Sequence, residues 1–107
     1  MSDGSSEEAR WFVVDGRRWR RSDPTLPSEV EERLLHHLGR GRSGVRTAKR
    51  AGDEEALAAA RHRVRVAKVG LGERGDPWWE QDPDVRERRW TDALAGLDGL
   101  DGLDGRE

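Results

Sequence analysis

The sequence predicts a small α+β fold in which an N-terminal β-hairpin packs on an antiparallel two-helix hairpin, with disordered termini. Three observations lead to this prediction. An Asp-Gly pair at residues 15–16 lies between residues that favour strands. Two amphipathic segments follow it and are separated only by residues 51–53. A mean hydropathy of −1.01 and a charged fraction of 39% indicate that part of the 107-residue chain stays disordered.

The first ordered element is predicted to be a β-hairpin over residues 11–21. Asp-Gly favours a two-residue type I′ turn, whose two central positions both need a positive φ. Such a turn pairs residues 11–14 with residues 17–20 and places Phe12 opposite Trp19 on one face. We expect this face to meet the helices, because an isolated two-stranded hairpin is only marginally stable in water.

Residues 27–51 are predicted to form the first long helix. Their apolar residues recur at steps of three, four and seven, and Ser28 with Glu31 forms a capping-box pattern. Glycine costs about 1 kcal/mol relative to alanine in a helix interior, so a break into two shorter helices is one alternative. We favour a continuous helix, because the apolar stripe resumes in phase at Val45. The glycines in question are Gly39, Gly41 and Gly44.

Residues 53–71 are predicted to form the second helix. Asp53 is a suitable N-cap, and Gly72 is a suitable C-terminal stop. The connection over residues 51–53 is too short for anything but antiparallel neighbours. The seam between the two helices is rich in alanine, which allows close approach and also makes self-association of the chain possible.

The remaining segments complete the predicted organisation. Residues 1–10 are polar and are expected to be disordered. A Trp-Trp segment over residues 76–80 is expected to pack back over the hairpin, so that residues 11–80 form a single small domain. Residues 81–95 can form a short helix. The Leu-Asp-Gly repeat within residues 96–107 is expected to be disordered, because glycine at every third residue opposes helix and strand.

Three motifs resemble a family of small, uncharacterised bacterial proteins found in high-GC bacteria. They are DGRRWRRSDP at residues 15–24, RTAKRAGD at residues 46–53 and LGERGDPWWE at residues 71–80. Some members of that family carry an automated label as Tol-type biopolymer transporters. The resemblance covers about residues 11–80 and implies that they form one unit. It supplies no catalytic residue.

Charge is distributed unevenly along the chain. Residues 38–75 hold 10 basic and 4 acidic residues, whereas residues 76–107 hold 4 basic and 10 acidic residues. Basic clusters of this kind bind nucleic-acid phosphates or acidic proteins, although a solvated helix face gives the same pattern. The acidic C-terminal segment could also fold back on this surface. The candidate partner-binding residues are Arg40, Arg42, Arg46, Arg61, Arg65, Trp78 and Trp79.

The tryptophans have two interpretations. Trp11, Trp78 or Trp79 could form an exposed site for a protein partner, because aromatic residues dominate binding hot spots. We favour the alternative that the tryptophans are the core of the domain, because the chain has five Trp, one Phe and no Tyr and little else in it is large.

Several kinds of chemistry are not expected from this sequence. The chain has no cysteine, so disulfides and zinc sites built on cysteine are excluded. Its histidines, His36, His37 and His62, have poor spacing for one metal ion, and we expect no metal and no cofactor. No set of nucleophile, base and orienting group is visible, so an enzyme is not expected.

No apolar run approaches the length of a membrane span, and the acidic N-terminus lacks the apolar stretch of a secretory signal. We therefore expect a cytoplasmic location and no membrane contact. The predicted function is a non-enzymatic binding or adaptor module that binds a protein partner. The alternative is a nucleic-acid-associated protein that uses the basic helix faces.

Overall fold

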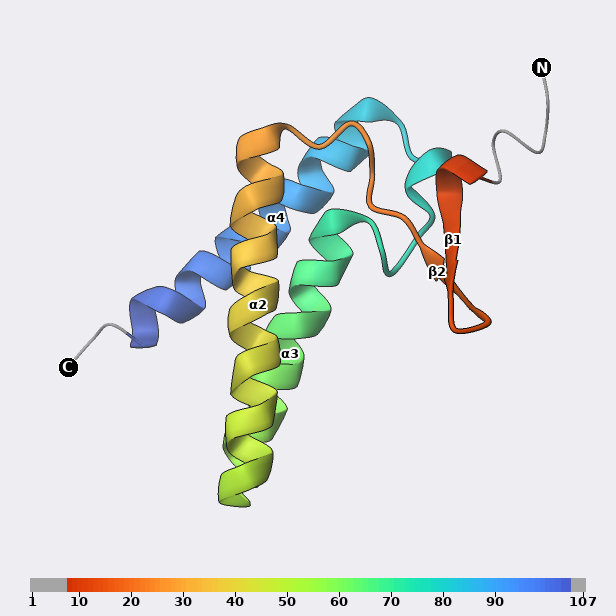
Figure 1. Cartoon of the computed structure of the whole chain (residues 1–107). Coiled ribbons are helices and arrows are strands. Elements are labelled where there is room, and N and C mark those ends of the chain that lie inside the picture. Colours follow the sequence, from red (N-terminus) through yellow and green to blue (C-terminus); the bar gives the residue numbers. More distant parts are fainter. Residues whose placement is uncertain (1–7, 105–107) are drawn as a thin grey trace.

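The computed structural model describes residues 8–104, and the side chains of residues 8–101. It contains a two-stranded antiparallel sheet and three long helices (Figure 1). The predicted α+β class is therefore confirmed. In chain order the elements are β1 (Trp11–Val14), β2 (Arg17–Arg20), α2 (Ser28–Ala51), α3 (Glu54–Leu71), the 3-10 helix η1 (Trp78–Glu80) and α4 (Pro83–Asp104).

Two of the three long helices pair closely with each other, and the third makes a smaller contact with this pair. Helices α2 and α3 are antiparallel neighbours, and α4 crosses them near the end that carries the sheet (Figure 1). The tip of the α2–α3 pair, around residues 51–53, extends beyond α4. The molecule is accordingly elongated, with extents of 54 × 33 × 20 Å.

The hairpin has the predicted register. Trp11 pairs with Arg20 and Phe12 with Trp19 across the antiparallel ladder. Asp15 and Gly16 both have positive φ, at 53° and 78°, as a type I′ turn requires. A local turn signal was therefore sufficient to specify this element.

Helix α2 runs unbroken from Ser28 to Ala51, so the continuous-helix alternative is correct. Two of its glycines face α3, where a side chain would not fit. A Cβ atom on Gly41 would lie 2.7 Å from Cγ2 of Val64, and one on Gly44 would lie 3.1 Å from Cβ of Ala60. The propensity cost of these glycines is thus offset by close helix packing.

The predicted capping box at the start of α2 is wrong. The N-cap residue is Pro27, and no side chain caps the helix. Ser28 is the first helical residue, one position after the N-cap. Its hydroxyl is therefore not placed to accept a hydrogen bond from the free backbone N–H groups of the first turn.

Helix α3 begins and ends as predicted. The Asp53 side chain accepts a hydrogen bond of 3.0 Å from the backbone N–H of Ala56, as an N-cap does. Gly52 and Gly72 end α2 and α3 in the left-handed conformation, with φ of 68° and 88°. The short connection therefore makes the two helices antiparallel, as expected.

Helix α4 overturns two expectations about the C-terminal segment. A short helix over residues 81–95 was predicted, with disorder over residues 96–107, but one helix continues to Asp104. The Leu-Asp-Gly repeat has a period of three, close enough to 3.6 that Leu97 and Leu100 fall on one face of a helix. Leu97 is completely buried against the core, and this burial outweighs the poor helix propensity of glycine.

The structure describes the chain up to a few residues from each end. Residues 8–10 are helical, so the prediction of disorder over residues 1–10 is wrong there. The rest of that segment, residues 1–7, lies outside the described residues, as do residues 105–107 at the other end of the chain.

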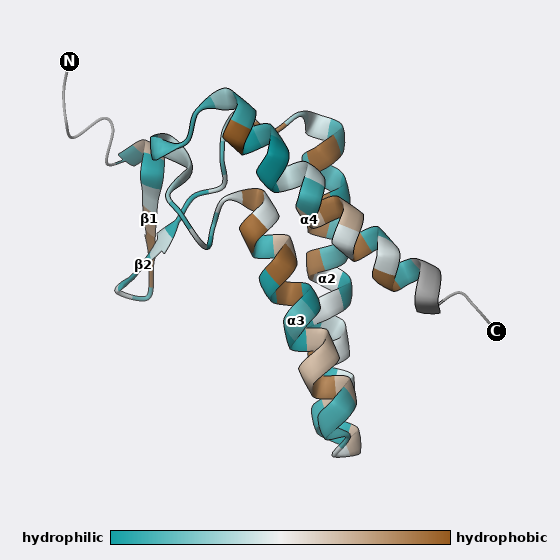
Figure 2. Cartoon of the chain, turned by 180° about the vertical axis from the view of Figure 1, so that it is seen from behind, coloured by the Kyte–Doolittle hydropathy of each residue, from teal (hydrophilic) through white to brown (hydrophobic). Residues whose placement is uncertain are grey.

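The hydrophobic core lies where all three long helices meet. Hydrophobic and hydrophilic segments alternate along α4, as Figure 2 shows, and its hydrophobic positions supply part of this core. Residues 11–80 are therefore not a complete unit, because α4 is needed to cover the α2–α3 pair. The buried core residues are Leu26, Leu34, Leu38, Ala67, Leu71, Ala93, Leu94 and Leu97.

A buried carboxylate ties the connector before α2 to α4. Asp23 accepts hydrogen bonds of 2.8 Å and 2.6 Å from the backbone N–H and the hydroxyl of Thr25. It also accepts from the guanidinium groups of Arg89 at 2.8 Å and Arg86 at 3.3 Å. Burial acts to raise the pKa of Asp23, but these hydrogen bonds outweigh it and hold the pKa below its ordinary value.

The hairpin is attached to the helices through its base. Trp78 is buried, and its ring N–H donates a 2.9 Å hydrogen bond to the backbone oxygen of Arg21. Trp79 packs edge-on against both Trp78 and Trp11, with ring centroids 5.2 Å and 5.8 Å apart. The expected contact of the Trp-Trp segment with the hairpin is therefore present, on the Trp11 side.

Candidate functional site

Most of the arginines singled out from the sequence surround one cavity. Arg42 and Arg46 of α2 lie across from Arg61 and Arg65 of α3, around a cavity of about 490 Å³. Val45 and Val64 complete its lining, together with Arg74 from the loop after α3, which the sequence analysis missed. We call these seven residues the arginine cleft: Arg42, Val45, Arg46, Arg61, Val64, Arg65 and Arg74.

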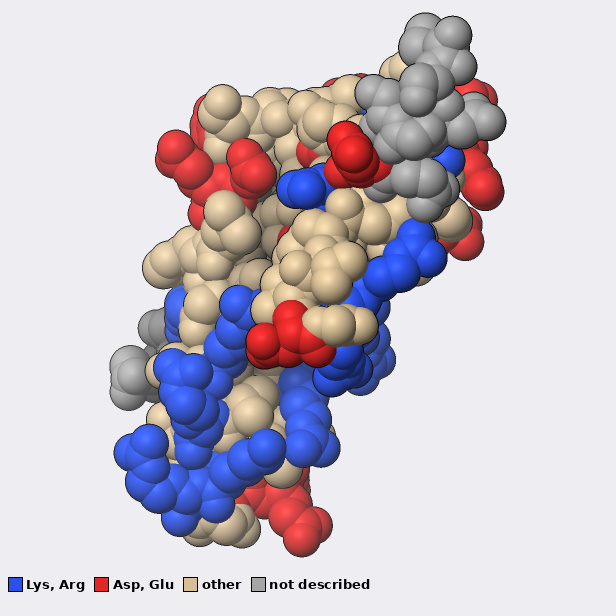
Figure 3. Space-filling model, turned by 45° about the vertical axis from the view of Figure 1, so that its right-hand side comes forward, with Lys and Arg blue, Asp and Glu red and all other residues tan. Residues whose placement is uncertain are grey.

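The arginine cleft follows from the register of the helix pair. Gly41 lies against Val64 and Gly44 lies against Ala60, so the order of the arginines along the antiparallel pair is Arg65, Arg42, Arg61 and Arg46. All five of its arginines are exposed. Figure 3 shows Lys and Arg side chains gathered over the lower part of one face of the molecule, where the α2–α3 pair lies.

The electrostatics of the neighbouring Lys68 reflect this concentration of positive charge. Burial lowers the pKa of the Lys68 ammonium, and the charges of Arg74 and Arg42 lower it further. Glu73 acts in the opposite direction but does not cancel the effect.

Three of the predicted site residues lie elsewhere. Arg40 forms an ion pair with Asp101 of α4 and does not line the arginine cleft. Trp78 is buried and Trp79 is half-buried between Trp78 and Trp11, so neither ring is an exposed binding surface. The interpretation as a core residue fits Trp78, whereas Trp79 is only partly buried.

A second cavity of about 410 Å³ lies between the β-hairpin and α2. Phe12 and Trp19 point toward the helices, as expected, but each remains 37% exposed across this gap. We call this cavity the hairpin cleft. Its apolar lining is Phe12, Val14, Trp19, Leu35 and Leu38, and its polar lining is Arg42, Lys68 and Glu73.

Only one weak signal in the sequence indicated the hairpin cleft. Leu35 is 47% exposed, and it lies next to the buried Leu34 on the polar side of α2. A leucine off the apolar stripe of an amphipathic helix was the available clue. Arg42 lines both cavities, so the two clefts adjoin.

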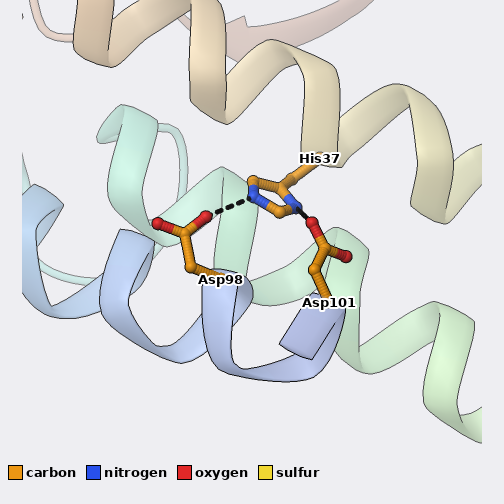
Figure 4. A group of neighbouring side chains, drawn as sticks. All are labelled: His37, Asp98 and Asp101. Atoms are coloured by element: carbon orange, nitrogen blue, oxygen red, sulfur yellow. Dashed lines mark hydrogen bonds and ion pairs between the residues drawn. The ribbon is translucent and has the colours of Figure 1, made fainter. Parts of the chain in front are cut away.

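A third group joins α4 to the helix pair. His37 of α2 is buried, and its Nε2 atom lies 3.0 Å from Oδ1 of Asp98 (Figure 4). Its Nδ1 atom lies 2.9 Å from NH1 of Arg63 on α3. A guanidinium nitrogen can only donate, so Nδ1 accepts and the imidazole is neutral, with its proton on Nε2 directed to Asp98.

The carboxylates of this group are neutralised by arginines. Asp101 accepts a 3.0 Å hydrogen bond from Arg63 and also pairs with Arg40, while Asp98 pairs with Arg33. Burial acts to raise the pKa of Asp101, but the hydrogen bond from Arg63 and the charge of Arg40 outweigh it and lower the pKa. We call this group the interhelical ion-pair cluster: Arg33, His37, Arg40, Arg63, Asp98 and Asp101.

Three members of the interhelical ion-pair cluster have the spacing of metal ligands. One atom each of His37, Asp98 and Asp101 lies within 4.8 Å of the others. However, both ring nitrogens of His37 are engaged in hydrogen bonds, and three guanidinium groups already balance the two carboxylates. The arrangement therefore serves to join three helices.

The hypothesis that the acidic segment folds back on basic residues is correct in one respect. Asp98 and Asp101 reach Arg40 and Arg63, but no carboxylate lines the arginine cleft among the residues that the structure describes. Within that same part of the chain, none of the helices has the length and apolarity needed to cross a membrane.

Comparisons with known proteins assign this chain to no family. No protein-family model, curated protein or solved structure matches this chain. The resemblance of residues 11–80 to a family of small bacterial proteins therefore stays a prediction.

Proposed function

We propose that this chain is a non-enzymatic binding or adaptor module, and that its hairpin cleft binds an apolar segment of a protein partner that also carries acidic residues. The observation that supports this proposal best is the gathering of exposed apolar side chains around one cavity. Phe12, Val14, Trp19 and Leu35 are all exposed and all line the hairpin cleft.

Exposed apolar residues indicate a binding site when several of them are contiguous. Single exposed hydrophobic residues are common on any protein, whereas a patch of several around a concave surface is typical of a binding site. Val85 on α4 is an example of the scattered kind, because it is 40% exposed but lies outside the hairpin cleft.

The rim of the hairpin cleft supports an acidic partner. Arg42 and Lys68 line it, and the guanidinium of Arg17 lies 5.2 Å from the centre of the Trp19 ring. The one acidic residue of the lining, Glu73, accepts a 2.7 Å hydrogen bond from the Ser22 hydroxyl. Acidic residues flanking an apolar anchor would complement this positive rim.

The character of the lining favours a protein over a nucleic acid at this cleft. Valine and leucine side chains form much of it, and they suit the aliphatic and aromatic side chains of a peptide. Base stacking would need an open aromatic face, but the Trp19 ring is already approached by Arg17 and by Lys68 at 5.7 Å. A small domain without cysteine needs no oxidising compartment to fold, which supports a cytoplasmic location for this binding.

Selection from a random peptide library displayed on phage tests this proposal. We expect the immobilised full chain to enrich peptides that combine a large apolar residue with neighbouring Asp or Glu. Leu35→Glu should weaken binding of such a peptide about tenfold or more, because it places a charge in the apolar lining. Val85→Glu is the matched control, since it changes an equally exposed residue outside the cleft, and it should leave the affinity within about twofold.

Two results would contradict the proposal. One is a selection that enriches no common sequence. The other is an enriched peptide whose affinity for the Leu35→Glu and Val85→Glu variants is the same, with both variants shown to be folded by their circular dichroism.

A further inference from the structure

The arginine cleft is a second site, separate from the hairpin cleft in its lining and in its chemistry. Five of its seven lining residues are arginines, and the other two are valines. No acidic residue is among its lining residues. Its dominant property is positive charge around a concave space.

The arginines of the cleft have no ion pair or hydrogen bond within residues 8–101, whose side chains the structure describes. This distinguishes them from Arg33, Arg40 and Arg63 on the same two helices, which pair with α4. Like charges held together without counterions destabilise a fold slightly. An anionic ligand would relieve this repulsion.

The arginines of the helix pair alternate between α2 and α3 along the cleft. Gly41 lies against Val64 and Gly44 against Ala60, so the order along the pair is Arg65, Arg42, Arg61 and Arg46. Neighbours in this order are about two residues apart in level, or about 3 Å along the axis, because each residue rises about 1.5 Å. Arg74 lies at the same cavity from the loop beyond α3. The positive charges therefore follow a line, which suits an extended anion better than a compact one.

The density of charge favours phosphate over carboxylate. A chain of phosphates carries a negative charge at every link, and each phosphate can accept hydrogen bonds from two N–H groups of one guanidinium. An extended acidic peptide rises about 3.3 Å per residue and directs alternate side chains away from the cleft, so it brings fewer charges to the same length.

We propose that the arginine cleft binds a linear oligophosphate, either the backbone of a single-stranded nucleic acid or a free inorganic polyphosphate. The phosphates lie along this line of arginines, and Val45 and Val64 form the floor of the cleft. This binding is independent of the hairpin cleft, apart from the shared Arg42.

Fluorescence anisotropy with labelled oligo-dT of about 15 nucleotides tests the proposal in its first form, at about 50 mM and about 200 mM salt. We expect binding that weakens steeply with salt. Arg46→Ala with Arg61→Ala should reduce the affinity about tenfold or more and lower the salt slope by about two, one for each lost phosphate contact. Both residues are exposed, so the fold should be unaffected.

Arg50→Ala is the matched control, because Arg50 is exposed on the same helix as Arg46 but lies outside the cleft. Its affinity should stay within about twofold of the unmodified chain. Arg42 is left unchanged in this experiment, so that a loss of binding cannot come from the hairpin cleft.

Competition identifies the source of the phosphates. Inorganic polyphosphate that displaces oligo-dT, and that binds directly with equal or higher affinity, indicates a free polyphosphate. Weaker displacement indicates a nucleic acid. The proposal is overturned if neither probe binds at low salt, if polyglutamate of equal charge competes as well as polyphosphate, or if Arg50→Ala weakens binding as much as the double variant.

Discussion

Arginines on two sides of the α2–α3 pair have opposite surroundings. Arg33, Arg40 and Arg63 meet carboxylates of α4 and belong to the interhelical ion-pair cluster. The five arginines of the arginine cleft have no such partner among the side chains of residues 8–101. The same residue type on the same helices thus contributes to the fold on one side and leaves a concentrated positive charge on the other.

The difference arises from where α4 crosses. Two acidic residues of the helix, Asp98 and Asp101, reach one side of the pair, and its leucines enter the core beside them. Acidic residues therefore balance some of the arginines and not others, although the total formal charge of the chain is only −2. A net charge near zero gives no indication of how unevenly the surface is charged.

The largest expected effect concerns the attachment of α4 itself. Leu97→Ala should lower the free energy of unfolding by about 2–5 kcal/mol, because Leu97 is completely buried and the cavity left behind cannot refill easily. Leu35→Ala, at an exposed leucine, should change it by less than about 1 kcal/mol. Denaturation by urea measures both. Equal effects would show that α4 does not stabilise the helix pair.

A smaller effect separates the two groups of arginines. Asp101→Asn removes the charge that Arg63 and Arg40 face, and it should cost about 1 kcal/mol of unfolding free energy. Arg46→Ala should cost nothing and could raise the stability slightly, because it relieves repulsion within the arginine cleft. A loss of stability in Arg46→Ala equal to that in Asp101→Asn would remove the distinction between paired and unpaired arginines.

The smallest expected effect is a dependence on acid pH. The folded-state pKa of Asp101 lies below its ordinary value of 3.8, so its contribution is complete above that value and is lost as the pH falls through the folded pKa. In Asp101→Asn, the free energy of unfolding should therefore fall less steeply between about pH 4 and about pH 2 than in the unmodified chain. Near neutral pH the slope of stability against pH should be the same in both chains. Asp23, whose pKa is also lowered, keeps a residual slope in the variant. Urea denaturation at a series of pH values measures the change in slope, and identical slopes for both chains would contradict the assignment.

Local signals in the sequence predicted the hairpin and the ends of α3 correctly. The Asp15-Gly16 turn and the Asp53 cap both act through bonds within a few residues, so no knowledge of the rest of the fold was needed. Continuity of α2 was also predictable, although the reason for its glycines was not. Gly41 and Gly44 matter through their contact with α3.

Long-range contacts defeated the other predictions. The glycines of the Leu-Asp-Gly repeat suggested disorder, but Leu97 gains more from burial than those glycines cost in the helix. Arg40 was grouped with Arg42 because they are close in sequence. A helix turns about 100° per residue, so two residues apart they face nearly opposite directions, and Arg42 lines the arginine cleft whereas Arg40 does not.

The buried carboxylate of Asp23 has a consequence for synthesis on the ribosome. Its partner Arg89 lies 66 residues further along the chain, and Arg86 lies 63 residues further. While the nascent chain lacks α4, that carboxylate has only Thr25 to satisfy it, and burying it would be unfavourable. The connector before α2 therefore reaches its final position only after α4 has emerged from the ribosome.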